Sequence, residues 1–460
     1  MTADLTRRLT ELIEEHEVPG AQVAVLAGGE IAEAAAGVLN TATGVAVTTD
    51  SVFQIGSVTK TWTATLVMQL VADGLIELDA PVRRYLPEFR LGDAAATAAI
   101  TVRQLLDHTS GIEGDLFLDT GRGSDAVARL VAALGEAGQV HRPGELFSYC
   151  NSGYVVLGRL LEVLRGKPFD EVLRERLIGP LGLRQAAVDA DEAILFRAAV
   201  GHLPGAPGQA MRPAPVWALA ASNAPAGARL SMSAGDLVRY AGMHLAGGVA
   251  PDGTRVLPES VARAMTRPQV ALPDIGYGSH WGLGWQLFDP AGSGLFGHDG
   301  STIGQNAYLR IAPGGVAVAL LTNGGNTSAL CRDLLGELLF EHAGIRLPEP
   351  ARPPVRAEPV DAAWVSGVYR SAMAEHVVEV DSDGRAWLRT KPLTELAALV
   401  TPPARVELVR LRSDLLITAA PARGRHAVYA LLGGKGNGNG EGGGSGARFL
   451  HASRAMPRQE

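Results

Sequence analysis

The stretch Ile55-Gly56-Ser57-Val58-Thr59-Lys60 decides how this chain is interpreted, and it continues into the run Thr61 to Leu70. That run is apolar almost all round, which is typical of a helix buried inside a domain. In a helix that begins near Ser57, residues 57 and 60 share one face, with Cβ atoms roughly 5–6 Å apart. The helix start also leaves the Ser57 N–H without an intrahelical partner, and it places positive dipole where negative charge could form.

Lys60 would be a cation drawn into a medium of low dielectric. Burial lowers the pKa of an ammonium group, and a neutral amine beside a hydroxyl activates a serine nucleophile. The alternative is a serine N-cap followed by a snorkelling lysine. Composition favours catalysis. The chain uses arginine nearly everywhere else that a cation is needed, and arginine cannot give up its proton. The chain has only four lysines: Lys60, Lys167, Lys391 and Lys435.

Composition limits the classes of function. The chain has 460 residues, of which 47% are hydrophobic and 19% are charged, as in an ordinary globular protein with a sizeable core. A net charge of -7 gives no basic surface for nucleic acid, so we expect no nucleic-acid partner. No apolar run reaches the roughly 18 residues of a membrane span, so we expect no membrane partner.

The beginning of the chain predicts an amphipathic helix and not a secretory signal. Leu5, Leu9, Leu12 and Ile13 fall on one side of this charged segment, and the apolar core of a signal peptide is missing. The two cysteines, Cys150 and Cys331, form no C-x-x-C motif and no disulfide framework. We therefore expect a cytoplasmic protein.

Turn signals divide residues 1–345 into strand-rich ends and a helical middle. Gly28-Gly29 separates two short apolar runs, which predicts a β-hairpin. We interpret residues 22–26, 31–35, 284–288, 307–311 and 316–321 as strands, and residues 328–342 as a helix. Helical patterns dominate residues 57–183. The prediction is an α+β fold, an α/β sandwich with helices flanking one antiparallel sheet, which both ends of the region close around an inserted helical subdomain.

A proline-rich segment separates this domain from the tail. Residues 346–360 form a stiff, extended linker. Residues 361–456 contain short alternating runs, which predict a small all-β barrel that shapes substrate access as a separate module. The predicted strands are residues 367–371, 377–380, 386–390, 406–411, 415–418 and 427–431, and the glycine-rich residues 433–446 are expected to be a flexible hairpin loop.

Further motifs follow the serine and lysine. Tyr149 and Asn151 lie on one side of a turn before an apolar helix. His298-Asp299-Gly300-Ser301 follows a short apolar run, as if a strand lined a cleft. Alone, Tyr149 is typical of a core aromatic residue and the second motif of a glycine-rich turn. Residues 105–112 carry no obvious chemistry and are interpreted as structural.

Together, S-x-x-K at Ser57, Y-x-N at Tyr149 and H-x-G at His298 resemble the serine β-lactamase and penicillin-binding protein superfamily. The class C branch, which includes esterases, D-amino acid amidases and acyltransferases, is the most similar. The resemblance covers about residues 5–345. The tail resembles the lipocalin-like domain that some members carry.

The resemblance implies a role for each residue. Ser57 would attack a carbonyl and form an acyl-enzyme, and Lys60 would take its proton. Tyr149, as a phenolate or a shuttle, would pass protons to the leaving group and the incoming nucleophile. Asn151 would bind the acyl amide of the substrate and the amine of Lys60. The backbone N–H groups of Ser57 and Ser301 would form the oxyanion hole, whose loss typically costs ~10²–10³ in rate.

The third motif departs from the penicillin-recognising pattern. Those members carry lysine where this chain has His298, which is mostly neutral near pH 7 at an ordinary pKa of about 6.5. With Gly300, this motif would bind substrate, and the change favours esters, amides or thioesters without an obligatory carboxylate. Asp299 could pair with an incoming ammonium group; the alternative is that it turns outward and supports the turn.

The predicted function is a serine acyl hydrolase or acyltransferase for a small-molecule or peptidyl acyl substrate, with an amine as a candidate acceptor. We expect no cofactor and no metal, and the sequence leaves the oligomeric state open. The arginine-rich, lysine-poor composition suggests a natural-product pathway. Alternatives are a peptide-cyclising thioesterase of the penicillin-binding protein type, a weak β-lactamase or carboxylesterase, and a non-catalytic ligand-binding protein. No G-x-S-x-G or H-E-x-x-H motif occurs, which argues against an α/β-hydrolase and a zinc hydrolase.

Overall fold

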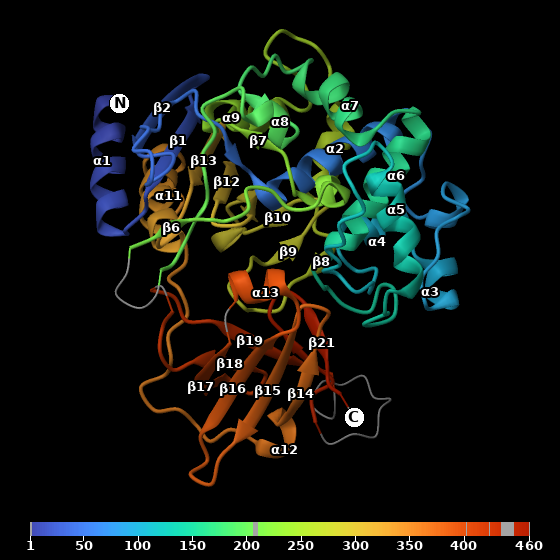
Figure 1. The fold of residues 1–460 in the computed structure, drawn as a ribbon, viewed down its shortest axis with the longest axis vertical. Coiled ribbons are helices and arrows are strands. Elements are labelled where there is room, and N and C mark those ends of the chain that lie inside the picture. The colour runs from blue at the N-terminus through green and yellow to red at the C-terminus, as the bar shows by residue number, and fades with distance from the viewer. Residues whose placement is uncertain (1, 206–209, 402, 423, 434–445, 460) are drawn as a thin grey trace.

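The computed structural model describes residues 2–205, 210–401, 403–422, 424–433 and 446–459. A large part that combines helices with an antiparallel sheet lies above a smaller part built from strands (Figure 1). The glycine-rich loop expected over residues 433–446 falls mostly outside the described residues. The α+β fold with an appended all-β unit is confirmed.

The large part is organised around an eight-stranded antiparallel sheet in the order β2-β1-β13-β12-β11-β10-β9-β8. The predicted hairpin forms strands β1 and β2 on either side of Gly28-Gly29, and β1 pairs with β13, with Val23 opposite Leu320. The two ends of this part therefore close one sheet, as predicted. The strands are β1 (Gly20–Ala27), β2 (Glu30–Gly37), β8 (Val270–Ala271), β9 (His280–Trp281), β10 (Gln286–Leu287), β11 (Phe296–Ser301), β12 (Asn306–Ala312) and β13 (Val316–Thr322).

Helices α1 (Thr2–Glu15) and α11 (Thr327–Ala343) cover one face of this sheet (Figure 1). Helix α1 buries its predicted apolar side, from Leu5 to Ile13. These side chains form one core cluster with the strands and with the apolar side of α11. Because both helices present an apolar stripe, burial on the sheet stabilises them more than intrinsic helix propensity does.

The opposite face carries the helical subdomain and the central helix α2 (Thr59–Ala72). Every residue of α2 from Thr59 to Leu70 is buried, as its lack of a polar face predicts. Three of its threonines donate to nearby carbonyls; the Oγ of Thr61, for example, donates to Val58 O at 2.8 Å. The other helices are α3 (Ala94–Ala99), α4 (Val102–Leu106), α5 (Ala126–Ala133), α6 (Asn151–Arg165), α7 (Phe169–Leu173), α8 (Ala190–Ala193), α9 (Ala234–Leu245) and α10 (Glu259–Met265).

The smaller part is a second eight-stranded antiparallel sheet, with strands β14 to β21 in chain order. Its ends meet, because Tyr369 pairs with Arg458 and the Gln459 N–H donates to Val368 O at 2.7 Å. We call this unit the barrel. Its strands are β14 (Gly367–Arg370), β15 (Ala374–Val380), β16 (Ala386–Pro392), β17 (Ala404–Arg412), β18 (Leu415–Thr418), β19 (Val428–Leu432), β20 (Phe449–His451) and β21 (Ala455–Pro457). The sequence predicts the first six strands but not β20 and β21.

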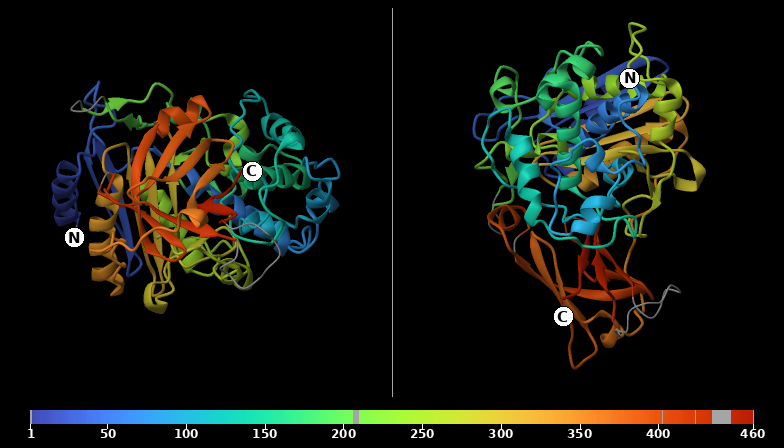
Figure 2. Two further views of the ribbon diagram at one scale, coloured as in Figure 1. Left: turned by 90° about the horizontal axis from the view of Figure 1, so that it is seen from below. Right: turned by 90° about the vertical axis from the view of Figure 1, so that its right-hand side faces the viewer.

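The barrel packs against the side of the large part where β8, β9 and the β8–β9 connection lie (Figures 1 and 2). Ile275 of that connection forms a small apolar cluster with Leu415 and Ala430 of the barrel. Exposed ion pairs join Arg412 to Asp274 and Arg448 to Glu145. Exposed pairs of this kind contribute little energy each, so the buried contacts must carry most of the attachment.

Candidate active site

Ser57 and Lys60 lie at the start of the central helix, as predicted, but not on one regular turn. Ser57 belongs to a short 3-10 turn, Gly56–Val58, and α2 begins at Thr59. The Lys60 Nζ lies 3.1 Å from the Ser57 Oγ, and it also donates to the Ala226 carbonyl at 2.5 Å. The Lys60 side chain is completely buried.

The surroundings of Lys60 favour its neutral amine. Burial lowers the pKa of Lys60 well below its usual range, and the positive charge of Arg454 lowers it further. Asp115 and Cys150 act in the opposite direction but do not outweigh burial. The amine therefore has a lone pair with which it can accept the Ser57 proton.

His108 fixes one side of the loop that carries Tyr149. His108 lies beneath it: the His108 carbonyl accepts the Ser148 N–H at 2.9 Å, and its Nδ1 accepts the Cys150 N–H at 3.0 Å. The rings of His108 and Tyr149 pack with centroids 4.4 Å apart. Residues 105–112 therefore have the structural role that the sequence analysis gave them.

The Tyr149 hydroxyl is buried, and it has no hydrogen-bond partner of normal geometry among the described residues. Burial raises the pKa of Tyr149 well above its usual range; the neighbouring Ser57 hydroxyl and the Arg454 charge offset only part of this effect. Lys60 Nζ lies 4.9 Å from the centroid of the Tyr149 ring. A neutral phenol beside a neutral amine and a serine hydroxyl can relay protons without a net charge in the resting site.

Asn151 begins helix α6 and is tied to a carboxylate that the sequence analysis missed. Its Nδ2 donates to Asp115 Oδ1 at 2.6 Å, and no bond to Lys60 is present between these described residues. Asp115 also binds Arg454, whose Nε lies 2.5 Å from Oδ2. Asp115 is only 8% exposed, and it accepts hydrogen bonds from both Asn151 and Arg454.

Strand β11 passes so close to Ser57 that only glycine fits at the contact. A Cβ at Gly300 would lie 1.9 Å from the Ile55 carbonyl oxygen, and a Cβ at Gly56 would lie 2.6 Å from the Ser301 nitrogen. The Gly300 position also lies close to Ser57, with 3.0 Å between a Cβ there and the Ser57 nitrogen, so the backbones of the two segments lie side by side. An oxyanion hole formed by the N–H groups of Ser57 and Ser301 stays a prediction.

The other residues of the third motif have different positions. Asp299 lines the pocket and pairs with Arg310, whose Nη1 lies 2.5 Å from Oδ1. His298 does not line the pocket; its ring is fully buried against Trp281, with centroids 5.3 Å apart. Burial lowers the pKa of His298 to about 3, so the ring is neutral. Direct substrate binding by His298 stays a prediction.

The pocket above Ser57 has a volume of about 270 Å³. Opposite charges lie on its wall, from Asp299 and from Arg454 at the tip of the β20–β21 hairpin, beside apolar surface. The barrel thus contributes a side chain to the pocket, and its role as a separate module that shapes substrate access stays a prediction. The lining residues are Ser57, Phe117, Tyr149, Asn151, Leu219, Asn223, Ala226, Gly227, Ala228, Tyr277, Asp299, Ser301 and Arg454.

The residues whose spacing could suit a metal ion lie away from the pocket. In the part of the chain that the structure describes, Glu15, His16 and Asp333 form the one group with metal-like spacing, on and beside α1 and α11. His16 Nε2 and Asp333 Oδ2 already contact each other at 2.8 Å. Across the same described residues, no helix is long and apolar enough to cross a membrane.

Comparison with known proteins agrees with this geometry. A sequence profile of the β-lactamase family matches residues 5–340. Penicillin-binding protein 4 of Amycolatopsis lactamdurans is 50% identical over 366 residues, which cover 79% of this chain and 96% of that protein. Esterase EstB of Burkholderia gladioli is 30% identical over 369 residues, which cover 70% of this chain and 90% of that protein.

A solved structure extends the similarity to the barrel. SurE superposes with a TM-score of 0.78 at 30% identity, over 100% of this chain and 99% of that one. The fold and site define a serine hydrolase of the kind that includes penicillin-binding proteins. The chain belongs to the β-lactamase family.

Proposed function

We propose that this protein is a Ser57-dependent acyl hydrolase or acyltransferase for small or peptidyl esters, amides or thioesters. The observation that carries the proposal is the fully buried Lys60 amine, 3.1 Å from the Ser57 hydroxyl on the floor of a pocket. Burying a lysine side chain in this way costs stability. The buried position is useful when the neutral amine offers its lone pair as a base.

The proposed reaction has two halves. The Ser57 proton passes to Lys60 Nζ while Oγ bonds to the substrate carbonyl carbon, and the oxyanion is held by the N–H groups of residues 57 and 301. Lys60 returns a proton through the Tyr149 hydroxyl to the leaving group as its bond to the carbonyl carbon breaks. In the second half, water or an amine bonds to the acyl carbon and gives its proton to Lys60 along this path. As the bond between that carbon and Ser57 Oγ breaks, Lys60 returns the proton to Oγ and Ser57 is restored.

The position of Arg454 favours a substrate or acceptor that carries a carboxylate. Its side chain is 35% exposed and lines the pocket, and one carboxylate, Asp115, already binds part of its donor edge. Guanidinium groups bind carboxylates with two parallel bonds where geometry allows. SurE has also been solved with D-Leu, an amino acid, and that chain is 29% identical to this one. We propose that the substrate or the acceptor here is an amino acid or peptide with a free carboxylate near Arg454.

The proposed acceptor is an amine. Asp299 on the opposite wall is 34% exposed, and it is a candidate partner for an incoming ammonium group, although Arg310 already balances much of its charge. Transfer to a metabolite or peptide amine within a natural-product pathway is therefore proposed as the physiological step, with hydrolysis as the competing outcome.

The test of the proposal is covalent labelling followed by product analysis. Wild-type protein treated with p-nitrophenyl acetate or an acyl-phosphonate is expected to gain one adduct on Ser57 by intact mass, and Ser57→Ala is expected to gain none. Product partitioning with increasing D- and L-amino acids then separates transferase from hydrolase. Acid as the sole product at every amine concentration would leave a hydrolase, and an unlabelled Ser57 would favour the non-catalytic ligand-binding protein.

Peptide cyclisation is a second candidate. The lining residue Phe117 is followed in the chain by Leu118, which is 47% exposed, and we propose that a longer apolar substrate chain would lie against these two side chains. A linear peptidyl thioester would give a cyclic product in this case, and mass spectrometry separates it from the linear acid by one water. Weak β-lactamase activity is a less supported alternative, because His298 is neutral where a fixed cation would hold the substrate carboxylate.

We also propose a cytoplasmic location. Cys150 and Cys331 are free, buried thiols, as is common where the cell keeps cysteines reduced. Fractionation of the producing cells, with a cytoplasmic and a secreted marker measured together, tests this location.

A further inference from the structure

The barrel hairpin β20–β21 binds three consecutive residues that end at Tyr149. His451 Nε2 donates to the Phe147 carbonyl at 2.8 Å, and the Ala455 N–H donates to the Ser148 Oγ at 3.1 Å. The Tyr149 N–H itself donates to the carbonyl of Ser453 at 2.9 Å. The hairpin therefore acts on the backbone of the predicted proton relay and not only on the rim of the pocket.

These bonds complete a clamp around the Tyr149 loop. On the other side, His108 accepts the N–H groups of Ser148 and Cys150, so the loop is fixed by both its own domain and the barrel. Tyr149 is only 3% exposed, and without Ser453 its backbone N–H would lose its partner in a buried position. Leaving a buried donor unpaired is unfavourable, so the loop would be expected to rearrange until this N–H found another partner.

Ser453 has a backbone conformation suited to this single contact. Its φ is +67°, in the left-handed region that residues other than glycine rarely adopt. It lies in the turn between His451 and Ala455, which pair as strand partners, and the Ala452 N–H closes the turn by donating to Arg454 O at 3.1 Å. Strained backbone of this kind is common at functional sites, and here the strained residue accepts a hydrogen bond from a candidate catalytic residue.

His451 is the second fixed point. Its ring is fully buried, and because a carbonyl can only accept, Nε2 must carry the proton that is donated to Phe147. Burial lowers the pKa of His451 to about 4, so this donor keeps the same neutral form over the working pH range. The contact therefore acts as a constant support and not as a pH switch.

We propose that the β20–β21 hairpin is a positioning element for Tyr149, with the Ser453 carbonyl and the His451 imidazole holding the Tyr149 loop where its hydroxyl faces Ser57. The inference rests on the proposed function, because it assigns these barrel residues a role in the same acyl transfer. A displacement of about 1 Å in a catalytic group can cost ~10²-fold in rate, so this support is large enough to matter.

The inference predicts a specific dependence on the leaving group. A p-nitrophenolate leaves with little need for a proton, whereas an alkoxide or amine must receive one, and Tyr149 is the proposed donor. Loss of positioning should therefore slow acylation by an alkyl ester about 10–100-fold and acylation by a p-nitrophenyl ester much less. A merely destabilised protein would lose both activities together.

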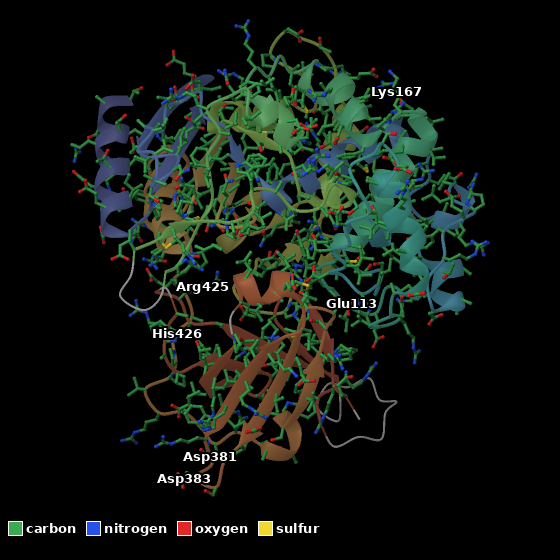
Figure 3. The ribbon with its side chains drawn as sticks, in the orientation of Figure 1. Glu113, Lys167, Asp381, Asp383, Arg425 and His426 are labelled. Carbon is green, nitrogen blue, oxygen red and sulfur yellow. The ribbon has the colours of Figure 1, made fainter. Side chains whose placement is uncertain are left out.

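The test compares Ser453→Val with a control variant in another hairpin of the same barrel. Valine is poorly tolerated at positive φ, so the Ser453 carbonyl is expected to move. Gly384 has a similar φ of +79° in the β15–β16 turn, beside Asp383, which lies at the end of the barrel remote from the large part (Figure 3). Gly384→Val is expected to strain the barrel equally and to leave both rates unchanged. Glycine adopts positive φ freely, so Ser453→Gly is expected to keep the wild-type rate on both esters.

A double-mutant cycle decides the mechanism. In a Tyr149→Phe background, Ser453→Val is expected to cause no further loss, because the group that it positions is gone. Additive losses in this cycle, or a folded Ser453→Val with the wild-type rate on the alkyl ester, would overturn the inference. If Ser453→Val does not fold, His451→Phe carries the same cycle, with His451→Gln as the variant that retains a donor.

The failure of the inference is distinguishable from failure of the proposed function. Ser57→Ala is assayed alongside, and equal turnover by this variant and the wild type would overturn the proposed function and the positioning role with it. Turnover that depends on Ser57 but falls additively in the cycle would overturn the positioning role alone.

Discussion

Lys60 shows how one residue can be both a predictable and a costly part of the site. The S-x-x-K spacing and the scarcity of lysine pointed to it from the sequence, and the structure adds the two contacts that orient its amine. We expect Lys60→Arg to fold but to lose at least ~10²-fold in Ser57 acylation, because a guanidinium cannot act as a base. Stopped-flow acylation with an activated ester measures this rate, and near-normal acylation would remove Lys60 from the role of base.

The burial of Lys60 also predicts how the stability of the protein depends on pH. Because burial lowers the pKa of Lys60 in the folded state, the unfolded state binds more protons between that pKa and about 10.4. Burying the charged form of Lys60 lowers the free energy of unfolding by about 1.4 kcal/mol for each unit by which the folded pKa lies below 10.4. This loss of stability is complete at pH values below the folded pKa, and it disappears as the pH rises towards about 10.4. Lys60→Met should therefore be more stable than the wild type near neutral pH, less the constant cost of leaving the Ala226 carbonyl without its donor.

Urea unfolding of Lys60→Met and wild type at several pH values checks this stability prediction. The stability difference is expected to shrink steadily as the pH rises, while the variant stays inactive throughout. A difference that does not change with pH would mean that Lys60 keeps an ordinary pKa in the folded protein, and the proposed neutral base would lose its physical support.

Other residues of the site could not be found from the sequence. Asp115 and Arg454 are 339 positions apart, and neither belongs to a recognisable motif, yet they form an ion pair beside Asn151. Their pairing depends on how the barrel docks, which local sequence patterns do not encode. His298 shows the reverse limit, since its motif was recognised but its burial behind the pocket lining follows only from the packing of β11 on Trp281.

At the scale of elements, the close contact between β11 and the Ser57 turn would set the geometry of the proposed oxyanion hole. We expect Gly300→Ala to push β11 away, because its Cβ would lie 1.9 Å from a backbone oxygen that cannot move aside. Acylation should fall by ~10²-fold or more, which is the typical effect of losing an oxyanion donor. Gly336→Ala in α11 is the matched control, since a Cβ there meets nothing within 4 Å.

The control is expected to keep the wild-type rate and to gain slightly in stability, because alanine favours a helix more than glycine does. Labelling of Ser57 in both variants by the same phosphonate, with thermal unfolding measured in parallel, separates loss of geometry from loss of fold. A Gly300→Ala variant that acylates normally would show that the hole is built by other donors.

Elements were predicted well where their pattern is long and regular. The β1–β2 hairpin and helix α11 follow directly from glycine-bounded alternation and from a continuous helical run. Strands β20 and β21 were missed because each has only three residues and they follow a long glycine-rich stretch without a strand pattern. The short hairpin that they form is the element by which the barrel reaches the site, so the least regular part of the tail carries its most specific contacts.

At the scale of the whole molecule, the barrel and the large part should remain one functional unit even when the chain between them is cut. The linker is accessible, since Val355 is fully exposed at 104% of its reference area. The parts are held by the β20–β21 hairpin at Phe147 to Tyr149, by the cluster around Ile275 and by ion pairs that include Arg448 with Glu145. A protease site placed at residues 354–356 should therefore give a nicked protein that elutes as one species and labels Ser57 at the wild-type rate.

Separation of the two parts then tests which contacts matter. Salt screens the exposed ion pairs and mild urea weakens the apolar contacts, so in a combination of the two the nicked protein should dissociate before the intact chain loses activity. Labelling of Ser57 should fall as the barrel leaves, because Tyr149 loses its Ser453 contact and the pocket loses Arg454. The intact chain in the same solvent is the control. Undiminished labelling by the isolated large part would show that the barrel only shapes access, as the sequence alone had suggested, and that the hydrogen bonds between the two parts have no catalytic consequence.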